Sequence, residues 1–338
     1  MSDGPVLVTG ATGFLGSHLC RALAADGVDV RALCRPSSDR SVLADAGVEW
    51  VEGDVTDEAR MRAVVDGCAR VYHLAGVGLE AAPPATVRRV NVRGTENVVA
   101  AADASAVDRL VFTSTAGTRR ADGVADETDH ADPVGAYQEA KARAESVVDR
   151  AADRGLDAVT VHPTSVFGPG DEAFTGRLLG LAANPAMVAY LPGGVSFVGV
   201  ADAINGIRAA MTRGVAGEHY ILGGQNLAFA DALGVIAEEI DGSRPVVPVP
   251  GFALRAGGHV AALADDLLGV RFFPFGPDMA RLATRELFYT SEKARRELGY
   301  EYRPLRAVVG PAAAWHRDGE VPVPATGATD VPAAGTSD

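Results

Sequence analysis

The chain has 338 residues, 47% of them hydrophobic, and a formal net charge of −13. It can therefore bury one large domain with a smaller lobe, and it is unsuited to nucleic acid, whose phosphates are bound by basic clusters. No run of about 18 apolar residues predicts a membrane span, and no basic segment with an apolar core predicts export, so we expect a cytoplasmic protein. The three scattered cysteines, Cys20, Cys34 and Cys68, match no metal-ligand spacing and indicate no disulfide framework.

The chain begins with a pattern typical of dinucleotide binding. Residues 5–9 form a short apolar, β-branched run that predicts a buried strand, and residues 14–25 carry leucines at helical spacing. Gly10, Gly13 and Gly16 would permit a tight turn, close approach of a pyrophosphate and packing of helix on strand. The free N–H groups at the helix N-terminus would attract the phosphates. A glycine-rich turn without a ligand is the alternative interpretation.

The second predicted strand, residues 28–34, ends without a carboxylate and is followed by Arg35. An acidic residue at this place would hold the ribose 2′-hydroxyl of NAD, whereas an arginine suits the 2′-phosphate of NADP. The sequence therefore favours NADP(H) over NAD(H), unless Arg35 is merely solvated.

The third and fourth strands end in residues that suit the ligand-binding edge of an open α/β sheet. Residues 48–57 contain a strand and its exit, where Asp54 would face the ligand or cap the next helix. Residues 70–76 form a strand whose small terminal residues would let the backbone approach a cofactor. His73 in this strand and Asn91 at the following helix are expected to be structural.

The fifth and sixth predicted strands also end in polar or turn-forming residues. Residues 109–117 contain the hydroxyls of Ser114 and Thr115, either of which could hydrogen-bond a substrate oxygen. Side chains alternate along a strand, so only one of the two would point into the site. Residues 156–163 predict the sixth strand, and its exit over residues 164–171 would begin the substrate contacts.

The predicted helix over residues 136–150 carries the most informative pair, Tyr137 and Lys141. Residues four apart on a helix are neighbours on one face, so the phenol and the ammonium would point the same way. A nearby cation lowers the pKa of a phenol, and a tyrosine so tuned could exchange a proton at neutral pH. Only two of the 31 basic residues are lysines, Lys141 and Lys293, which makes the spacing more notable. A surface lysine near a half-buried tyrosine is the alternative.

The alternation of strands and helices up to residue 163 predicts an α/β fold: a Rossmann-type, doubly wound parallel sheet with helices on both faces. We assign residues 1–165 to this dinucleotide-binding domain and residues 166–320 to a smaller, mostly helical substrate lobe, some of whose chain returns to the sheet. The apolar run 252–276 predicts a lobe helix or a subunit contact rather than a membrane-surface helix, because it lacks a strongly basic face. Residues 321–338 predict a disordered tail.

Seven short segments, taken in chain order, form a pattern shared with a known family. They are Thr9-Gly-Ala-Thr-Gly-Phe-Leu-Gly16, Gly53-Asp54-Val55, His73-Leu-Ala-Gly76, Asn91-Val-Arg-Gly-Thr95, Phe112-Thr-Ser-Thr-Ala-Gly-Thr118, Tyr137-Gln-Glu-Ala-Lys141 and His162-Pro163. The pattern resembles the extended short-chain dehydrogenase/reductases of the NAD-dependent epimerase/dehydratase family, and most closely their dihydroflavonol-reductase-like branch. A weaker likeness continues through residues 197–203 and 291–300.

The resemblance implies a catalytic role for three residues. Tyr137 would be the acid/base, Thr115 would stand where the family has its catalytic serine or threonine, and Lys141 would bind the nicotinamide ribose and lower the tyrosine's pKa. Thr115 replaces the commoner serine, but the hydroxyl remains. A second departure is Ala201, which replaces the first aspartate of a frequent Val-Asp-Asp pattern and puts the hydrogen bonding of the lobe in doubt.

The resemblance also implies the cofactor contacts. The glycines would hold the pyrophosphate, Asp54 and Val55 the adenine, and Arg35 the 2′-phosphate. The full set of implied cofactor-binding positions is Gly10, Thr12, Gly13, Phe14, Leu15, Arg35, Asp54, Val55, Leu74, Ala75, Gly76, Tyr137, Lys141 and Pro163.

Three functions are compatible with this pattern. The first is an oxidoreductase that transfers hydride between NAD(P) and a small carbonyl or alcohol substrate, with Tyr137 as acid/base. The second is a nucleotide-sugar epimerase or dehydratase with retained NAD. Residues 192–196 lack the arginine that such enzymes usually carry there, although Arg177, Arg208 or Arg281 could replace it. The third, a non-catalytic cofactor-binding regulator, is disfavoured by the intact catalytic set. The family also implies a homodimer formed through the tyrosine-bearing helix.

Overall fold

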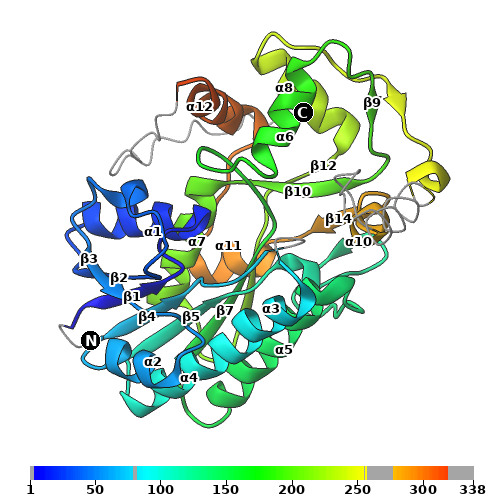
Figure 1. Ribbon diagram of the computed structural model, residues 1–338. Helices are drawn as coiled ribbons and strands as arrows, with labels where there is room; N and C mark the ends of the chain where they lie inside the picture. Colours follow the sequence, from blue (N-terminus) through cyan, green and yellow to red (C-terminus); the bar gives the residue numbers. More distant parts are fainter. Residues whose placement is uncertain (1–3, 79–81, 255, 257–276, 319–338) are drawn as a thin grey trace.

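The structure is a computed structural model that describes residues 4–78, 82–254, 256 and 277–318 (Figure 1). The predicted disordered tail and most of the apolar run 252–276 lie outside these residues. Within the described part of the chain, no helix is both long and apolar enough to cross a membrane.

A seven-stranded parallel sheet forms the larger part of the molecule, in the order β11-β7-β5-β4-β1-β2-β3. Its strands are β1 (Val6–Thr9), β2 (Val30–Cys34), β3 (Glu49–Glu52), β4 (Arg70–His73), β5 (Arg109–Thr113), β7 (Ala158–Pro163) and β11 (His219–Leu222). The strand order reverses between β1 and β4, and such a switch point opens the crevice in which open α/β sheets bind ligands. The predicted Rossmann-type fold is confirmed.

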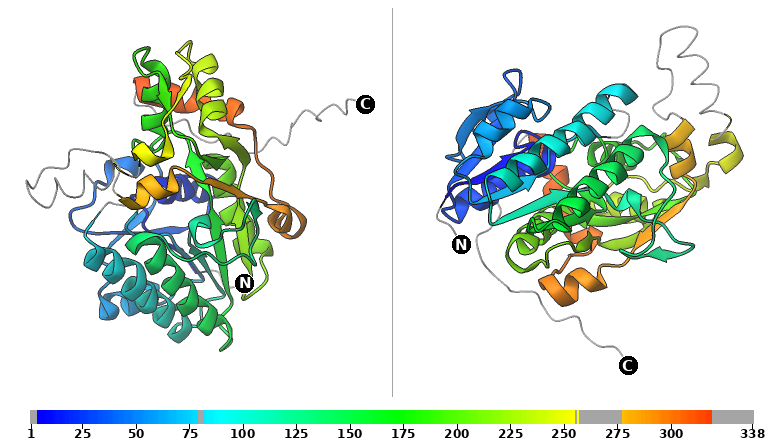
Figure 2. Two further views of the ribbon diagram at one scale, coloured as in Figure 1. Left: turned by 90° about the vertical axis from the view of Figure 1, so that its right-hand side faces the viewer. Right: turned by 90° about the horizontal axis from the view of Figure 1, so that it is seen from below.

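Helices cover both faces of this sheet (Figures 1 and 2). One face carries α1 (Phe14–Ala25), α7 (Val200–Arg213) and α11 (Glu292–Leu298), and the other carries α2 (Glu58–Val65), α4 (Gly94–Ala104) and α5 (Gly135–Ala152). Side chains alternate between the two cores: Val6 and Val8 pack on the α1 side, and Leu7 packs on the α2 side. Each large apolar side chain buried in this way contributes about 1.5–3 kcal/mol.

The helix predicted around Asn91 is interrupted by a π-helical turn. Helix α3 (Pro84–Arg88) runs into η2 (Arg89–Arg93), which continues as α4. Asn91 lies in the π-helical turn and is buried. Such turns often occur at functional sites because they re-aim the side chains that they carry.

The C-terminal lobe contains a second sheet in addition to its helices. Its strands are β12 (Gln225–Ala228), β10 (Gly194–Gly199), β14 (Glu286–Tyr289) and β6 (Val124–Ala125), with β8 (Ser165–Phe167) also paired to β10. Helices α6 (Thr175–Ala183), α8 (Phe229–Glu239) and α12 (Leu305–Asp318) pack on it around a separate apolar core. The sequence pattern did not predict this sheet, because its strands are short and glycines flank or enter them.

The lobe's hydrogen bonding does not depend on the aspartate that Ala201 replaces. Asp202, at the start of α7, is 6% exposed and accepts hydrogen bonds from the backbone N and the Nε of Arg303, each at 3.0 Å. Tyr300 adds a second tie, since its hydroxyl donates to the Gly223 carbonyl at 2.9 Å. One aspartate therefore suffices to join α7 to the segment that leads into α12.

Candidate active site

The turn between β1 and α1 can be made only with glycine at two positions. Gly10 has φ +72°, and a Cβ there would lie 2.7 Å from the Ala75 nitrogen. A Cβ on Gly16 would lie 2.0 Å from the Gly10 carbonyl oxygen. Gly13 is the N-cap of α1, and among the described residues no side chain caps this helix, so its first N–H groups can donate hydrogen bonds to an anion. Of the predicted cofactor contacts, Thr12 lies in this turn, and Phe14 and Leu15 are the first two residues of α1.

His73 ties the end of β4 to β1. Its Nδ1 lies 2.7 Å from the Thr9 hydroxyl and its Nε2 lies 2.9 Å from the Thr95 hydroxyl. The Thr9 hydroxyl also accepts a hydrogen bond from the Ala75 nitrogen at 3.1 Å, which fixes the backbone after β4. Burial lowers the pKa of His73 to about 3, so the ring is neutral at physiological pH. This geometry agrees with the structural role expected for His73.

The side chain of Asn91 fixes the backbone at Val77, in the segment that follows β4. Its Oδ1 accepts from the Val77 nitrogen at 2.7 Å, and its Nδ2 donates to the Val77 carbonyl at 2.9 Å. A Cβ on Gly76 would lie 3.1 Å from the Asn91 Oδ1 and 3.5 Å from the Lys141 Nζ. Because Gly76 has no side chain, the segment Leu74-Ala-Gly76 after β4 can lie beside Lys141 of α5.

Thr115, and not Ser114, meets the tyrosine. The Thr115 hydroxyl hydrogen-bonds Tyr137, and it also accepts from the Gly117 nitrogen at 3.2 Å at the start of η3 (Ala116–Thr118). Ser114 points to the other side and donates to the Glu145 carboxylate. The alternation of side chains expected for this strand end thus selects Thr115.

Lys141 lies on the same face of α5 as Tyr137 but is bound to the sheet. Its Nζ donates to the Thr113 carbonyl at 2.8 Å and lies 4.9 Å from the centre of the Phe112 ring. It is 5% exposed, so the alternative of a surface lysine is wrong. Burial lowers the pKa of Lys141 to about 8, against the opposing effect of Glu145.

The expectation of a lowered pKa for Tyr137 is wrong for this structure. Burial raises the pKa of Tyr137 to about 12, although the hydrogen bond with Thr115 acts in the opposite direction. Lys141 does not offset the effect of burial, because its ammonium is turned toward the Thr113 carbonyl. At neutral pH the phenol therefore carries its proton.

Asp54 stands at the carboxyl edge of the sheet and is not a helix cap. Its Oδ1 accepts from the Thr56 nitrogen at 2.9 Å and from the Thr56 hydroxyl at 2.8 Å. The cap of α2 is Asp57, which accepts from the Arg60 nitrogen at 2.9 Å. The capping alternative for Asp54 is therefore wrong. Its neighbour Val55 is buried against α4.

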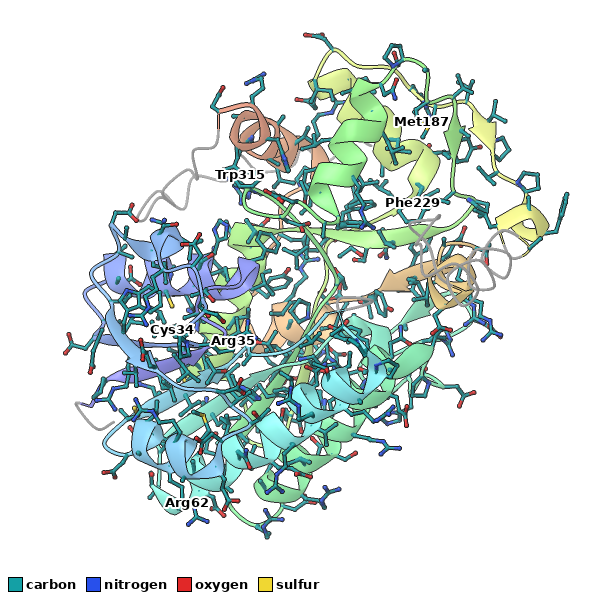
Figure 3. The ribbon with its side chains drawn as sticks, viewed as in Figure 1. Cys34, Arg35, Arg62, Met187, Phe229 and Trp315 are labelled. Atoms are coloured by element: carbon teal, nitrogen blue, oxygen red, sulfur yellow. The ribbon has the colours of Figure 1, made fainter. Side chains whose placement is uncertain are left out.

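Arg35 is exposed directly after β2, next to Cys34 (Figure 3). The pKa of Asp54 is lowered: burial raises it, but the hydrogen bonds from Thr56 and the charges of Arg35 and Arg89 prevail. Arg89, on η2, thus joins Arg35 near the predicted adenine end of the site. No motif in the sequence indicated Arg89.

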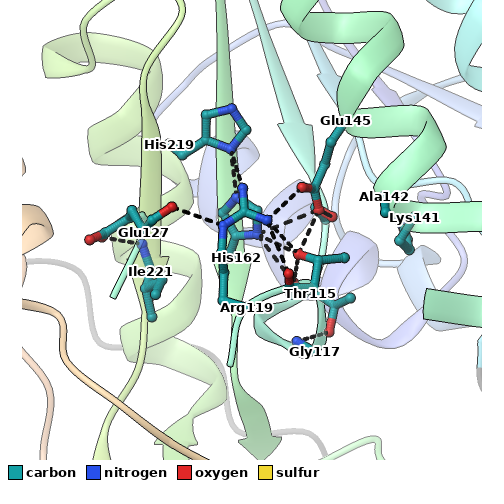
Figure 4. A network of polar contacts seen from close by, with 12 residues as sticks. Thr115, Gly117, Arg119, Glu127, Lys141, Ala142, Glu145, His162, His219 and Ile221 are labelled. Carbon is teal, nitrogen blue, oxygen red and sulfur yellow. Dashed lines mark hydrogen bonds and ion pairs between the residues drawn. The ribbon is translucent and has the colours of Figure 1, made fainter. Parts of the chain in front are cut away.

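The sequence also left Glu145 unassigned. It follows Lys141 by four residues and is buried on the same face of α5, where its carboxylate accepts from Ser114 (Figure 4). The spacing of Tyr137, Lys141 and Glu145 at i, i+4 and i+8 could have indicated that all three belong to one face.

Of the three lobe arginines considered as replacements for a sugar-diphosphate ligand, Arg208 is already engaged. It forms an ion pair with Asp26 at the end of α1. Arg177 and Arg281 are exposed. Pro163 ends β7 at the same sheet edge as the other predicted cofactor contacts.

Comparisons with known proteins agree with this geometry. Residues 6–223 match the NAD dependent epimerase/dehydratase family. The chain is 33% identical to sterol demethylase protein B of Methylococcus capsulatus over 92% of this chain and 98% of that protein. It is 30% identical to a putative dihydroflavonol 4-reductase of Synechocystis over 92% of this chain and 94% of that protein. The crystal structure of gox2253 superposes with a TM-score of 0.82 at 33% identity, covering 94% of this chain and 98% of the other.

These comparisons confirm the predicted family. The glycine turn, the sheet edge and the Tyr137 helix are the features that had indicated it. The glycine cradle fits a nicotinamide dinucleotide, because its backbone leaves no room for a Cβ and presents free N–H groups. The chain belongs to the NAD dependent epimerase/dehydratase family and is an NAD(P)-dependent enzyme of the extended short-chain dehydrogenase/reductase type.

Proposed function

We propose that this enzyme is a reductase that transfers hydride from NADPH to the carbonyl group of a small molecule. The observation that carries the proposal is the contact between the Thr115 hydroxyl and a Tyr137 that holds its proton at neutral pH. A protonated tyrosine can give its proton to a carbonyl oxygen, so the site suits reduction better than the removal of a proton from an alcohol.

Each catalytic side chain has a task that follows from its position. The cofactor would supply the hydride. Thr115 would donate a hydrogen bond to the substrate oxygen and hold it beside the phenol, and Tyr137 would transfer its proton to that oxygen. Lys141, next to Gly76 and bound to the Thr113 carbonyl, would hold the ribose hydroxyls of the cofactor.

The preference for NADP(H) rests on the residues after β2 and on η2. Arg35 is exposed at the end of β2, and both Arg35 and Arg89 act on Asp54. Two guanidinium groups suit a 2′-phosphate, since each can donate paired hydrogen bonds to its oxygens.

The nucleotide-sugar alternative has less support. Residues 192–196 carry no arginine, and Arg208 is paired with Asp26. The putative dihydroflavonol 4-reductase relative also favours a reductase. A non-catalytic regulator has less support, because the sequence carries all three residues of the expected catalytic set, Thr115, Tyr137 and Lys141.

The test begins with the purified protein. Nucleotide released by denaturation is identified, and NADPH oxidation is then followed with a panel of aldehydes and ketones. We expect little retained cofactor and turnover that depends on NADPH. Tightly retained NAD, with conversion of UDP- or dTDP-sugars and no net oxidation, would contradict the proposal and favour an epimerase or dehydratase.

We also expect a homodimer that forms through α5. The outward face of this helix carries an exposed ion pair between Glu139 and Arg143. Light scattering on the eluted protein would give twice the mass of the chain. A single-chain mass at micromolar concentration would contradict this expectation.

A further inference from the structure

A buried network of charged and polar side chains connects Glu145 of α5 with Arg119, His162 of β7 and His219 of β11 (Figure 4). At its centre is the carboxylate of Glu145, whose residue is 4% exposed. It accepts hydrogen bonds from the Ser114 hydroxyl, from the Thr118 hydroxyl at 2.8 Å and from the Arg119 Nη1 at 2.9 Å. All three donors belong to the segment that contains Thr115.

Arg119 joins Glu145 to His219 within the network. It is 3% exposed, and its Nη2 lies 3.0 Å from the Nδ1 of His219. Glu145, His162 and His219 have ligand atoms within 4.8 Å of one another, a spacing that could suit a metal ion. Because the guanidinium already bridges Glu145 and His219, we interpret the cluster as a salt-bridged network and not as a metal site.

The network continues to the backbone of Thr115. The Nδ1 of His162 lies 3.1 Å from the Thr115 carbonyl oxygen, and its Nε2 lies 2.9 Å from the His219 Nδ1. The segment is therefore held both through its hydroxyl groups and through its main chain. These contacts connect the end of β5 to α5, β7 and β11.

A buried ion pair is seldom retained for stability, because desolvation of the two charges offsets their attraction. The position of the Glu145–Arg119 ion pair, between α5 and the Thr115 segment, suggests that it orients the active site instead. Glu145 stands eight residues after Tyr137 on α5, and its three donors flank Thr115 in the chain. The carboxylate thus joins the two elements that must keep the two hydroxyls in contact.

We propose that Glu145 is a positioning residue of the active site: it fastens the Thr115 segment to the helix that carries Tyr137, and it places a negative charge one helical turn after Lys141. This inference deepens the proposed function and rests on it. Glu145 would touch neither the substrate nor the cofactor, and it would act through the groups that do.

The electrostatics of the cluster support the second half of this inference. Burial would raise the pKa of Glu145, but His162, Arg119 and the hydroxyls of Ser114 and Thr118 lower it, so the carboxylate is ionised at neutral pH. Burial lowers the pKa of Lys141, and Glu145 opposes that effect. The titratable or charged groups that surround the carboxylate are Lys141 and Asp149 on α5, Arg119 after η3, His162 on β7 and His219 on β11.

The first experiment compares Glu145→Gln with Glu292→Gln, which alters an exposed carboxylate of α11, away from α5. We expect Glu145→Gln to lower kcat by about 10- to 100-fold with little change in the KM for NADPH, because small displacements of reacting groups cost rate more than binding. Its activity should also be lost at lower pH on the basic side, by about one pH unit, since Lys141 loses the charge that favours its protonated form. Glu292→Gln should behave as the wild type.

The second experiment does not depend on activity. Because Lys141 and Lys293 are the only lysines, protein made with isotope-labelled lysine gives two Cε signals in an NMR titration, and Lys293→Arg assigns them. The Lys141 signal should titrate at lower pH in Glu145→Gln than in the wild type. An unchanged titration together with an unchanged kcat would overturn the inference.

A third variant covers the case in which Glu145→Gln does not fold. Thr118→Val removes one donor to Glu145 and keeps the carboxylate. It should lower kcat several-fold and leave the Lys141 titration in place, whereas full kcat would overturn the positioning role. If the wild type reduces no carbonyl, the proposed function fails by itself, and the lysine titration still decides whether Glu145 holds Lys141 protonated.

Discussion

Around β1 and the start of α1 the candidate site is made of backbone, whereas around α5 it is made of side chains. In the first region, Gly10 and Gly16 leave no room for a Cβ, and the N–H groups of α1 face the crevice. In the second region, the charge of the buried Glu145 carboxylate raises the pKa of both Tyr137 and Lys141. We infer that the first region is sensitive to added atoms and the second to removed functional groups. Substitutions in the two regions should therefore have different effects, which can be measured separately.

Tyr137→Phe should give the largest effect and should damage only the side-chain region. Removal of the phenolic hydroxyl takes away the proton donor, so kcat should fall by about 10²- to 10⁴-fold. NADPH affinity and thermal unfolding should change little, because the ring remains. Steady-state kinetics and fluorescence titration with NADPH would measure both.

Tyr302→Phe is the matched control, since Tyr302 is 38% exposed and lies in the segment before α12. It should retain wild-type kinetics. Full turnover of Tyr137→Phe would remove Tyr137 from the mechanism and with it the reductase proposal.

Gly16→Ala tests the backbone region. The added Cβ would lie 2.0 Å from the Gly10 carbonyl oxygen, so the turn must shift. We expect a loss of about 1–3 kcal/mol in the free energy of unfolding, and a loss of NADPH binding beyond what that destabilisation explains. Urea unfolding and cofactor titration would provide the two values.

Gly180→Ala controls for the chemistry of the substitution. Gly180 lies in α6, and among the described residues nothing comes within 4 Å of a Cβ placed there. Alanine at a helix interior should be neutral or stabilise the protein by up to about 1 kcal/mol. If Gly16→Ala bound NADPH as well as Gly180→Ala does, the backbone cradle would not be the pyrophosphate site.

The contrast between the two regions also explains which features of the candidate site could be predicted from the sequence. The glycine turn and the Tyr137–Lys141 spacing are local features, because each depends on residues within a few positions of one another. The network around Glu145 is not local. Arg119 meets Glu145 across 26 positions and His219 across 100 positions, and no periodicity in the sequence connects them.

The raised pKa of Tyr137 and the second sheet of the lobe also depend on residues far apart in the chain, so the sequence pattern did not predict them. The helical spacing placed Lys141 on the correct face, but the Thr113 carbonyl that binds its ammonium belongs to β5, 28 positions away. The second sheet pairs β10 with β8, β12 and β14, and these pairings depend on contacts far apart in the chain. Local propensity therefore predicted the main sheet and the motif residues but not these partners.

Arg35→Ala tests the edge of the backbone region, where the side chain of Arg35 would make the site prefer NADPH to NADH. We expect the Kd for NADPH to rise by about 10- to 100-fold and the Kd for NADH to stay the same, because one phosphate contact of about 1.5–3 kcal/mol is lost. Arg62→Ala, which alters an exposed arginine of α2, should leave both constants unchanged (Figure 3). Equal weakening of NADPH and NADH would show that Arg35 does not bind the 2′-phosphate.

The smallest predicted effect concerns the pH dependence of stability, and it involves one buried histidine from each region. Burial lowers the pKa of His73, beside the glycine turn, and of His162, in the Glu145 network, to about 3. An unfolded chain binds protons at these rings below a pKa of about 6.5, whereas the folded chain does not. The stability that they provide is therefore complete above about pH 6.5 and is lost as the pH falls toward the folded pKa.

Each histidine should add up to about 1.4 kcal/mol per pH unit to the slope of unfolding free energy between about pH 6 and pH 4. His73→Asn should remove one such contribution, because its neighbours Thr9 and Thr95 do not titrate in this range. His162→Asn should remove a similar contribution, because burial lowers the pKa of His162 to about 3 despite the opposing effect of Glu145, 3.7 Å away. Urea unfolding across this pH range would measure the slopes. A slope that His73→Asn lowers and His162→Asn leaves unchanged would mean that Glu145 holds the His162 ring protonated in the folded chain, and the prediction for the second region would then be wrong.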